Sequence, residues 1–239
     1  MLLLSLLSLV VVASVDGAGT VNSEALNMYK STFKGDGTYY GSSGGGGTCS
    51  YGVQNPPAAS GTKYPVALNS PQFMNSVMCG SCWRVTGAGT GSGHSPITGT
   101  FTVFVDNLCP ECHAGDLDLG VSGDGRWDIT IQAVQCPVGS GNVQFKFQGS
   151  NPYYVKLQVR NARLPVHVME IEQGGSFHAM THTGDGFFLY NGGPISGAFR
   201  VRLTAVNGAQ ITDTISGIVN DQILSGQNQF PLDSSLPSA

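Results

Sequence analysis

Residues 104–120 read FVDNLCPECHAGDLDLG, and this stretch carries most of the information on fold and chemistry. A strongly apolar strand pattern ends at Asp106, and a second aspartate, Asp118, stands between Leu117 and Leu119. A carboxylate in apolar surroundings loses solvation, which raises its pKa and makes a protonated acid available as a hydrogen-bond or proton donor at mild pH. The alternative is structural, because loop aspartates commonly cap turns. This stretch alone leaves both interpretations of Asp118 open.

Alternating apolar and polar residues predict strands on both sides of this stretch. Before the last cysteine, the alternating segments are 83–86, 100–105 and 127–134, with one short helix predicted over 71–77. After it, they are 143–147, 155–159, 166–171, 187–190, 199–204 and 210–215. Glycine makes up 34 of 239 residues and suits many turns, whereas charged residues, at 11%, are too few for a chain of amphipathic helices. The pattern predicts a mostly β protein, with a small barrel followed by an immunoglobulin-like sandwich.

The cysteines predict the redox compartment. All six lie in the first 136 residues, at Cys49, Cys79, Cys82, Cys109, Cys112 and Cys136. An even number in a secreted chain indicates three disulfides, for which fifteen pairings exist. The alternative is a four-cysteine zinc site built from the two Cys-x-x-Cys pairs. The apparent secretion and the two further cysteines favour disulfides.

Composition divides the chain into segments. Residues 1–18 hold an apolar run that is short for a bilayer span and predict a signal peptide, with a retained anchor as the alternative. A cysteine-bearing domain over 19–139 and a cysteine-free domain over 140–225 then follow, separated by a short linker at 137–142. The tail over 226–239 is polar and is expected to fray.

Two pairs of tyrosines are candidate sugar contacts, because ring faces pack on the CH surfaces of sugars. Tyr39 and Tyr40 lie in a short segment between glycines, where core packing is the alternative. Tyr153 and Tyr154 precede a strand. Alternation places Tyr154 on the solvent side with the polar residues of 156–160, and Tyr153 on the apolar side unless the strand begins one residue later.

Several classes of ligand are not expected. The net charge of −4 gives no basic footprint for nucleic acid. His178 and His182 have metal-like spacing only on a helix, and they lie in a strand-rich stretch, so no metal is expected. The glycine-rich runs at 87–93 and 44–47 lack the sequence context of dinucleotide or phosphate loops, so no cofactor is expected.

Three motifs resemble those of the expansins, particularly the microbial expansin-like proteins. They are GTYYG at 37–41, VDxxCPxCxxGxLDL at 105–119 and QVRNxxxPV at 158–166, in the family's order. The resemblance covers nearly the whole mature chain. It implies a six-stranded double-psi β-barrel related to family-45 glycoside hydrolases, followed by an immunoglobulin-like domain that binds cellulose.

The resemblance also assigns roles to residues. Asp118 matches the essential carboxylate of the barrel groove, and Asp106 matches its neighbouring acid. Thr38 and Tyr39, with Tyr40 beside them, match the groove lining, and the aromatic pair of the binding face falls on Tyr153 and Tyr154. The family's disulfide habits imply the pairs Cys49–Cys79, Cys82–Cys136 and Cys109–Cys112.

The chain also departs from the family pattern. A groove aromatic that is common in bacterial members falls on Leu108, and the third aromatic of the binding face falls near Asp185, with Phe187 as a candidate substitute. Tyrosines stand where tryptophans are more usual. Fewer and smaller rings predict a modest affinity for cellulose.

Inverting hydrolysis needs an acid and an opposed base, and the strand that would carry this base reads Tyr39-Tyr40-Gly41, without a carboxylate. The resemblance therefore predicts a secreted, monomeric, expansin-like protein of the extracellular space or cell wall. It would bind cellulose or a related wall glucan and loosen it without acting as an ordinary enzyme. The alternatives are a weak endoglucanase or lytic transglycosylase centred on Asp118, and an inert carbohydrate-binding wall protein.

Overall fold

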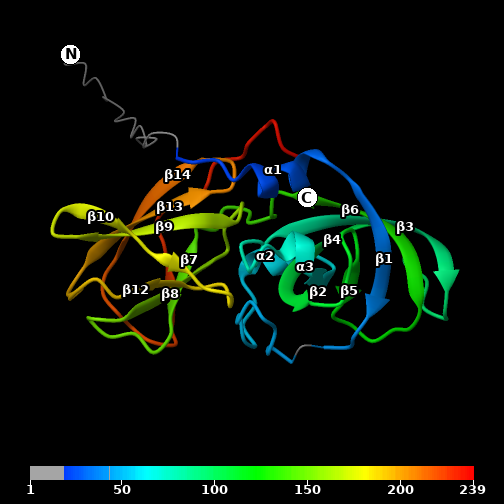
Figure 1. The fold of residues 1–239 in the computed structure, drawn as a ribbon, viewed down its shortest axis with the longest axis horizontal. Coiled ribbons are helices and arrows are strands. Elements are labelled where there is room, and N and C mark those ends of the chain that lie inside the picture. Colours follow the sequence, from blue (N-terminus) through cyan, green and yellow to red (C-terminus); the bar gives the residue numbers. More distant parts are fainter. Residues whose placement is uncertain (1–18, 43) are drawn as a thin grey trace, which may run out of the picture.

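The computed structural model describes residues 19–42 and 44–239, so the predicted signal peptide lies outside the described residues. Figure 1 shows a barrel and a sandwich side by side, joined by segments that cross between them. The predicted fold class is confirmed, because a closed barrel of six strands is followed by two further sheets. Within the described part of the chain, no helix is both long and apolar enough to cross a membrane.

The barrel strands are β1 (Phe33–Tyr39), β2 (Tyr64–Asn69), β3 (Cys82–Ser92), β4 (Thr98–Cys109), β5 (Leu117–Leu119) and β6 (Arg126–Val134). They close in the order β1-β5-β2-β4-β3-β6, with parallel pairs β1–β5 and β2–β4 among antiparallel neighbours. Their inward side chains form the core, and Trp83, Val85, Val103 and Ile131 are completely buried. Each such apolar side chain contributes about 1.5–3 kcal/mol by leaving water.

Three short helices accompany the barrel: α1 (Ser23–Lys30), α2 (Pro57–Ser60) and α3 (Ser70–Phe73). The helix predicted over 71–77 corresponds to α3 but ends earlier, because residues 74–76 have left-handed backbone with φ of 52°, 50° and 72°. Helix α1 is not among the elements predicted from the sequence. Its eight residues are marginal on their own, and Asn22 stabilises the helix by accepting a 3.1 Å hydrogen bond from the amide of Ala25.

The second domain is a sandwich of two sheets, ordered β10-β9-β13-β14 and β11-β12-β8-β7-β15. Its strands are β7 (Gln144–Phe147), β8 (Val155–Arg160), β9 (Val166–Gln173), β10 (Ser176–Ala179), β11 (Thr181–His182), β12 (Phe188–Tyr190), β13 (Phe199–Ala205), β14 (Gln210–Ile215) and β15 (Ile223–Ser225). The two inner faces meet through buried side chains such as Phe145, Leu157, Ile171 and Val201. All six segments predicted for this domain contain a strand of the sandwich.

All three disulfide pairs implied by the resemblance are present: Cys49–Cys79, Cys82–Cys136 and Cys109–Cys112. They leave no cysteine of the chain free. The alternative zinc site is excluded, because it would need four of these sulfurs as thiolates.

The polar face of β8 does not face water as the alternation predicts. Gln158 and Arg160 are buried against the barrel domain. Gln158 donates a 2.7 Å hydrogen bond from its side-chain amide to the carbonyl of Cys49, and the Arg160 guanidinium lies 4.9 Å from the ring centre of Tyr51. Period-two alternation separates the two faces of a strand, but it does not show that a polar face is covered by another domain.

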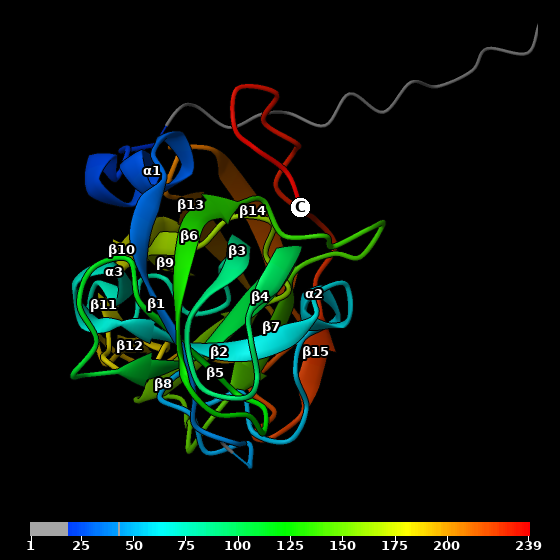
Figure 2. The same cartoon turned by 90° about the vertical axis from the view of Figure 1, so that its right-hand side faces the viewer.

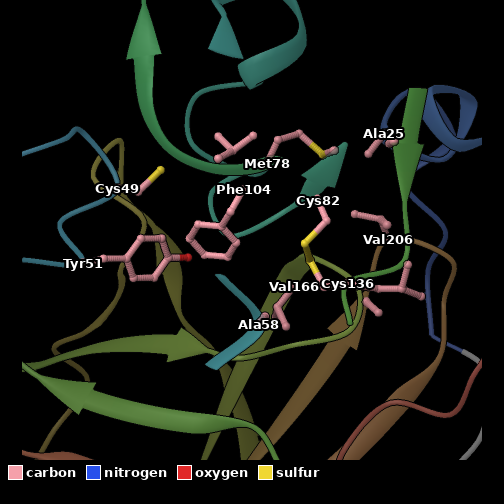
Figure 3. Close-up of a cluster of buried hydrophobic side chains, with 14 of the residues drawn as sticks. Ala25, Cys49, Tyr51, Ala58, Met78, Cys82, Phe104, Cys136, Val166 and Val206 are labelled. Atoms are coloured by element: carbon pink, nitrogen blue, oxygen red, sulfur yellow. A yellow bond between two sulfur atoms is a disulfide. The ribbon is translucent and has the colours of Figure 1, made fainter. Parts of the chain in front are cut away.

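An apolar cluster supports this junction. In Figure 3 the ring of Tyr51 lies beside that of Phe104, and the Cys82–Cys136 disulfide lies near Val166 of the sandwich. The two ring centres are 5.4 Å apart. This cluster draws on both domains, so it joins barrel and sandwich through a shared core.

The expectation of a frayed tail is wrong. The segment 226–239 leaves the sandwich and packs on the barrel, as the red trace in Figure 1 shows. The side-chain amide of Gln135 donates to the carbonyls of Asp233 and Leu236 at 2.9 and 3.1 Å, and Phe230 is buried. The buried side chains of Phe230 and Leu236, together with the buried amide of Gln135, order this otherwise polar segment.

Candidate functional site

The candidate site lies where the ends of β1 and β5 run parallel. Their register sets Thr38 beside Asp118. Leu117 and Leu119 point into the barrel core, so Asp118 projects from the opposite face of the strand. The Thr38 hydroxyl donates a 2.7 Å hydrogen bond to Oδ1 of Asp118. The structure therefore joins two residues that the sequence separates by 80 positions.

The surroundings of Asp118 perturb its protonation. Partial burial raises the pKa of this carboxyl, as the sequence predicts, and the hydrogen bond from Thr38 acts against that rise. The charge of Glu111 also raises the pKa of Asp118, and the charge of Arg126 lowers it. Burial is the largest of these influences, so Asp118 holds its proton to a higher pH than an ordinary aspartate does.

Asp118 and Thr38 line a pocket of about 160 Å³. The loop after β4 forms one wall of this pocket, and the Cys109–Cys112 disulfide closes that loop. The remaining lining side chains are charged or titratable: Asp36, Glu111, His113, Asp116 and Arg126. We call this pocket the groove site. It can donate and accept hydrogen bonds, as recognition of a sugar requires.

Asp116 positions the groove walls. One of its carboxylate oxygens accepts a 2.8 Å hydrogen bond from the backbone amide of Asp36, and the other accepts one of 2.9 Å from the amide of His113. Asp116 is buried, so both bonds fasten the cysteine loop to β1. Asp36 in turn forms a 2.7 Å ion pair with Arg126 of β6.

Four charged residues of the groove site are not among the predicted site residues: Asp36, Glu111, Asp116 and Arg126. The sequence could have predicted one of them. Asp36 lies two residues before Thr38, so strand alternation places both side chains on the same face of β1. No local pattern marks Arg126, whose place depends on the pairing of β6 with β1.

The structure does not bring Asp106 into the groove site. The β2–β4 pairing shifts by one residue here, with Val66 opposite Val105 and Ala67 opposite Asn107, so Asp106 is the extra residue of a bulge. Asp106 is buried, and its charge raises the pKa of Tyr51 rather than that of Asp118.

The carboxylate that acts on Asp118 is therefore Glu111, and the role of neighbouring acid implied for Asp106 is corrected accordingly. A bulge changes which face the following side chains occupy, and the sequence motif gives no sign of it.

Tyr39 and Tyr40 lie at and just beyond the end of β1, next to Thr38, and both are partly buried. The Tyr39 hydroxyl donates a 2.6 Å hydrogen bond to the carbonyl of Ser95. The Tyr39 ring packs closely on Gly123, because a Cβ atom added to Gly123 would lie only 2.5 Å from the ring. Neither tyrosine lines the groove site itself, so each is a flanking surface beside it.

Tyr153 and Tyr154 are the exposed aromatic pair of the sandwich, at 67% and 39% exposure. Strand β8 begins only at Val155, which frees Tyr153 from the apolar side. The turn between β7 and β8 and the end of β1 both lie toward the lower edge of the molecule in Figure 1.

Phe187 cannot serve as the third aromatic of this face. Its side chain is 0% exposed, and Lys156 Nζ lies 4.5 Å from its ring centre while forming a 2.6 Å ion pair with Asp185. The ring is buried, and Lys156 of this ion pair covers it. The substitution suggested by the sequence is therefore wrong.

No family model matches the chain. It is 33% identical to an expansin of Bacillus subtilis over 148 residues, which cover 56% of this chain and 62% of that protein. It is 25% identical to expansin-like protein 5 of Dictyostelium discoideum over 221 residues, or 89% of this chain and 92% of that protein.

Two solved structures of the Clavibacter michiganensis expansin share the fold. The apo form aligns with a TM-score of 0.70 at 26% identity, over 85% of this chain and all 100% of that one. An aspartate-to-asparagine variant of that expansin, in complex with cellohexaose, aligns with a TM-score of 0.71 at 26% identity and the same coverage. Both domains of this chain therefore have counterparts in one solved protein.

Proposed function

We propose that this chain, which is similar to expansins in sequence and fold, binds cellulose or a related wall glucan and loosens it without hydrolysis. The observation that carries the proposal is the half-buried carboxyl of Asp118, held by Thr38 at the groove site. A protonated carboxyl at this position donates a hydrogen bond to a glucan oxygen and displaces a bond between neighbouring chains. No covalent bond breaks in this step.

Two of the three other carboxylates that line the groove site are already engaged, which favours displacement over hydrolysis. An inverting hydrolase needs a second carboxylate that is free to activate water on the opposite face of the sugar. Asp36 is paired with Arg126, and Asp116 accepts two backbone amides. The strand end facing the groove presents Thr38 in place of a base.

We propose Tyr153 and Tyr154 as the aromatic platform of the binding surface. Both rings are exposed, and an exposed ring stacks on the CH face of a sugar. Cellohexaose is the ligand in the complex of the Clavibacter relative, which supports an unbranched glucan as one ligand of this chain. With two tyrosines and no third exposed ring from Phe187, the affinity for cellulose is modest.

We propose secretion to the extracellular space or cell wall as a monomer. The three disulfides support this location, because such bonds persist in oxidising compartments outside the cytosol. The net charge of −4 argues against nucleic acid as a partner.

A second candidate function is a weak endoglucanase or lytic transglycosylase. The observation in its favour is that Glu111 lines the same pocket as Asp118 and interacts with it electrostatically. Glycosidases ordinarily need two carboxyl groups at the scissile bond, and the groove site contains two that interact.

One incubation distinguishes these functions. Cellulose paper is treated with the wild-type protein, and tensile strength, reducing ends and anhydro-sugars are measured in the same sample. The proposal expects weaker paper and no released sugar. Sugar that accumulates in proportion to weakening would show an enzyme, and paper that keeps its strength while binding the protein would show an inert binding module.

A further inference from the structure

A second, larger depression lies on the flank of the barrel, outside the groove site. It has a volume of about 590 Å³ and is formed by β1, β6 and β3. These strands face the viewer in Figure 2, on the side of the barrel that is turned away from the sandwich. We call it the flank depression.

Its floor is open because small residues form it. Gly35 and Gly87 add no side chain, and Ala88 adds only a methyl group. At both glycines an added Cβ would point away from the depression, toward the backbone of Gly115 at 2.3 Å or of Ile97 at 2.5 Å. The side chain that leaves the floor open is therefore the methyl group of Ala88.

Its rim carries hydrogen-bonding groups in a row. The strand register sets Lys34 of β1 opposite Thr130 of β6, and Thr130 opposite Thr86 of β3. Two residues further along β1, on the same face of the sheet, Asp36 lies opposite Asp128 of β6. Ammonium, hydroxyl and carboxylate groups are the usual partners of sugar hydroxyls. Among the residues that the structure describes, the side chains of Lys34, Asp128 and Thr130 form no hydrogen bond or ion pair, so they are available to a ligand.

The flank depression continues the groove site. Asp36 lines both, and it forms an ion pair with Arg126, which lines the groove site. A glycan that extends from the groove site into the depression would therefore pass Asp36. The backbone of a β-linked glucan is stiff and extended, whereas a side branch leaves it at an angle.

We propose that the flank depression binds a neutral sugar branch of a glucan whose backbone lies in the groove site. The inference rests on the proposed function and names its substrate class, a branched wall glucan. A charged branch is not favoured, because Asp36 is paired with Arg126 and the charge of Lys34 offsets that of Asp128.

The test compares two ligands with the same backbone. Cellotetraose and a xylosyl-branched oligosaccharide built on cellotetraose are titrated calorimetrically into the full mature chain. One or two net hydrogen bonds from the branch predict that the branched ligand binds about threefold to tenfold more tightly.

Two variants locate the difference. Ala88→Ile fills the flank depression with a strand-favouring side chain that cannot stack on sugars, and it abolishes the preference without changing affinity for cellotetraose. Thr90→Ile makes a comparable change at an exposed position of the same strand outside the depression, and the preference remains. Thermal unfolding confirms that both variants fold.

Equal affinity of the wild type for the two ligands, or a preference that survives Ala88→Ile, overturns this inference while leaving the proposed function intact if cellotetraose binds. If neither oligosaccharide nor insoluble cellulose binds the wild type, the proposed function and the inference fail together.

Discussion

The hydroxyl of Thr38 and the carboxylate of Asp118 are joined by a 2.7 Å hydrogen bond between two parallel strands of the barrel. This bond fixes the orientation of the acid and favours its ionised form, while burial favours the protonated form. The balance between these effects sets the pH range in which Asp118 is protonated, and under the proposed function it sets the pH at which the acid donates a hydrogen bond to a glucan.

Replacing Thr38 by valine tests that balance. Thr38→Val keeps the β-branched shape but removes the donor, so the pKa of Asp118 rises further. If the protonated acid loosens the wall, the activity of the variant extends to higher pH than that of the wild type. Carboxyl carbon NMR measures the titration, and paper weakening across a pH series measures the activity. Thr90→Val, at an exposed position outside the groove site, provides the control. Unchanged titration of Asp118 in Thr38→Val would contradict the assigned role of Thr38.

The charges around the groove site predict two opposite shifts. Glu111→Gln removes a negative charge that raises the pKa of Asp118, so this pKa falls. Arg126→Gln removes a positive charge that lowers it, so the pKa rises. Both side chains are exposed, and added salt should therefore reduce both shifts. The same NMR titration at low and high salt checks the prediction, which shifts of equal sign would refute.

Tyr153 is predicted to contribute directly to cellulose binding. Its ring is 67% exposed, and loss of one stacked ring costs about 0.5–1.5 kcal/mol, so Tyr153→Ala weakens binding about threefold to tenfold. A pull-down isotherm on microcrystalline cellulose measures the change. Leu232→Ala removes a 60% exposed apolar side chain from the tail and should leave the isotherm unaltered. Equal isotherms for Tyr153→Ala and the wild type would remove Tyr153 from the binding surface.

Phe187 is predicted to affect stability instead of binding. Truncating a buried phenylalanine costs about 3–5 kcal/mol, so Phe187→Ala lowers the free energy of unfolding by roughly that amount. Denaturant unfolding measures this loss. At a temperature where the variant is folded, its cellulose isotherm should match the wild type, and a selective loss of binding would restore Phe187 to the sugar-binding face.

Local patterns predicted much of the fold. Alternation located the long strands, because a half-buried strand leaves a period of two in the sequence. The family's habits gave all three disulfide pairs. The motif around residues 105–119 pointed to Asp118, which lines the groove site, while its function stays a prediction.

The errors arise where distant segments meet. The polar residues Gln158 and Arg160 are buried because the barrel covers their face of β8, and the tail is ordered because Gln135 binds its carbonyls. Asp106 lies in a bulge outside the groove site, and this bulge depends on the pairing of β2 with β4. Each of these features depends on tertiary contacts that no local window of sequence contains.

The central claim is that Asp118 loosens a glucan that the protein binds by other contacts. The decisive measurement compares wild type, Asp118→Ala and Glu24→Ala for cellulose pull-down and for weakening of the same paper. Alanine removes the hydrogen-bond donor of the carboxyl, which asparagine would replace with its amide. Glu24 is exposed on helix α1, so its variant removes a carboxyl group outside the groove site. The account predicts equal binding by all three proteins and loss of weakening in Asp118→Ala alone. Undiminished weakening by Asp118→Ala would contradict it.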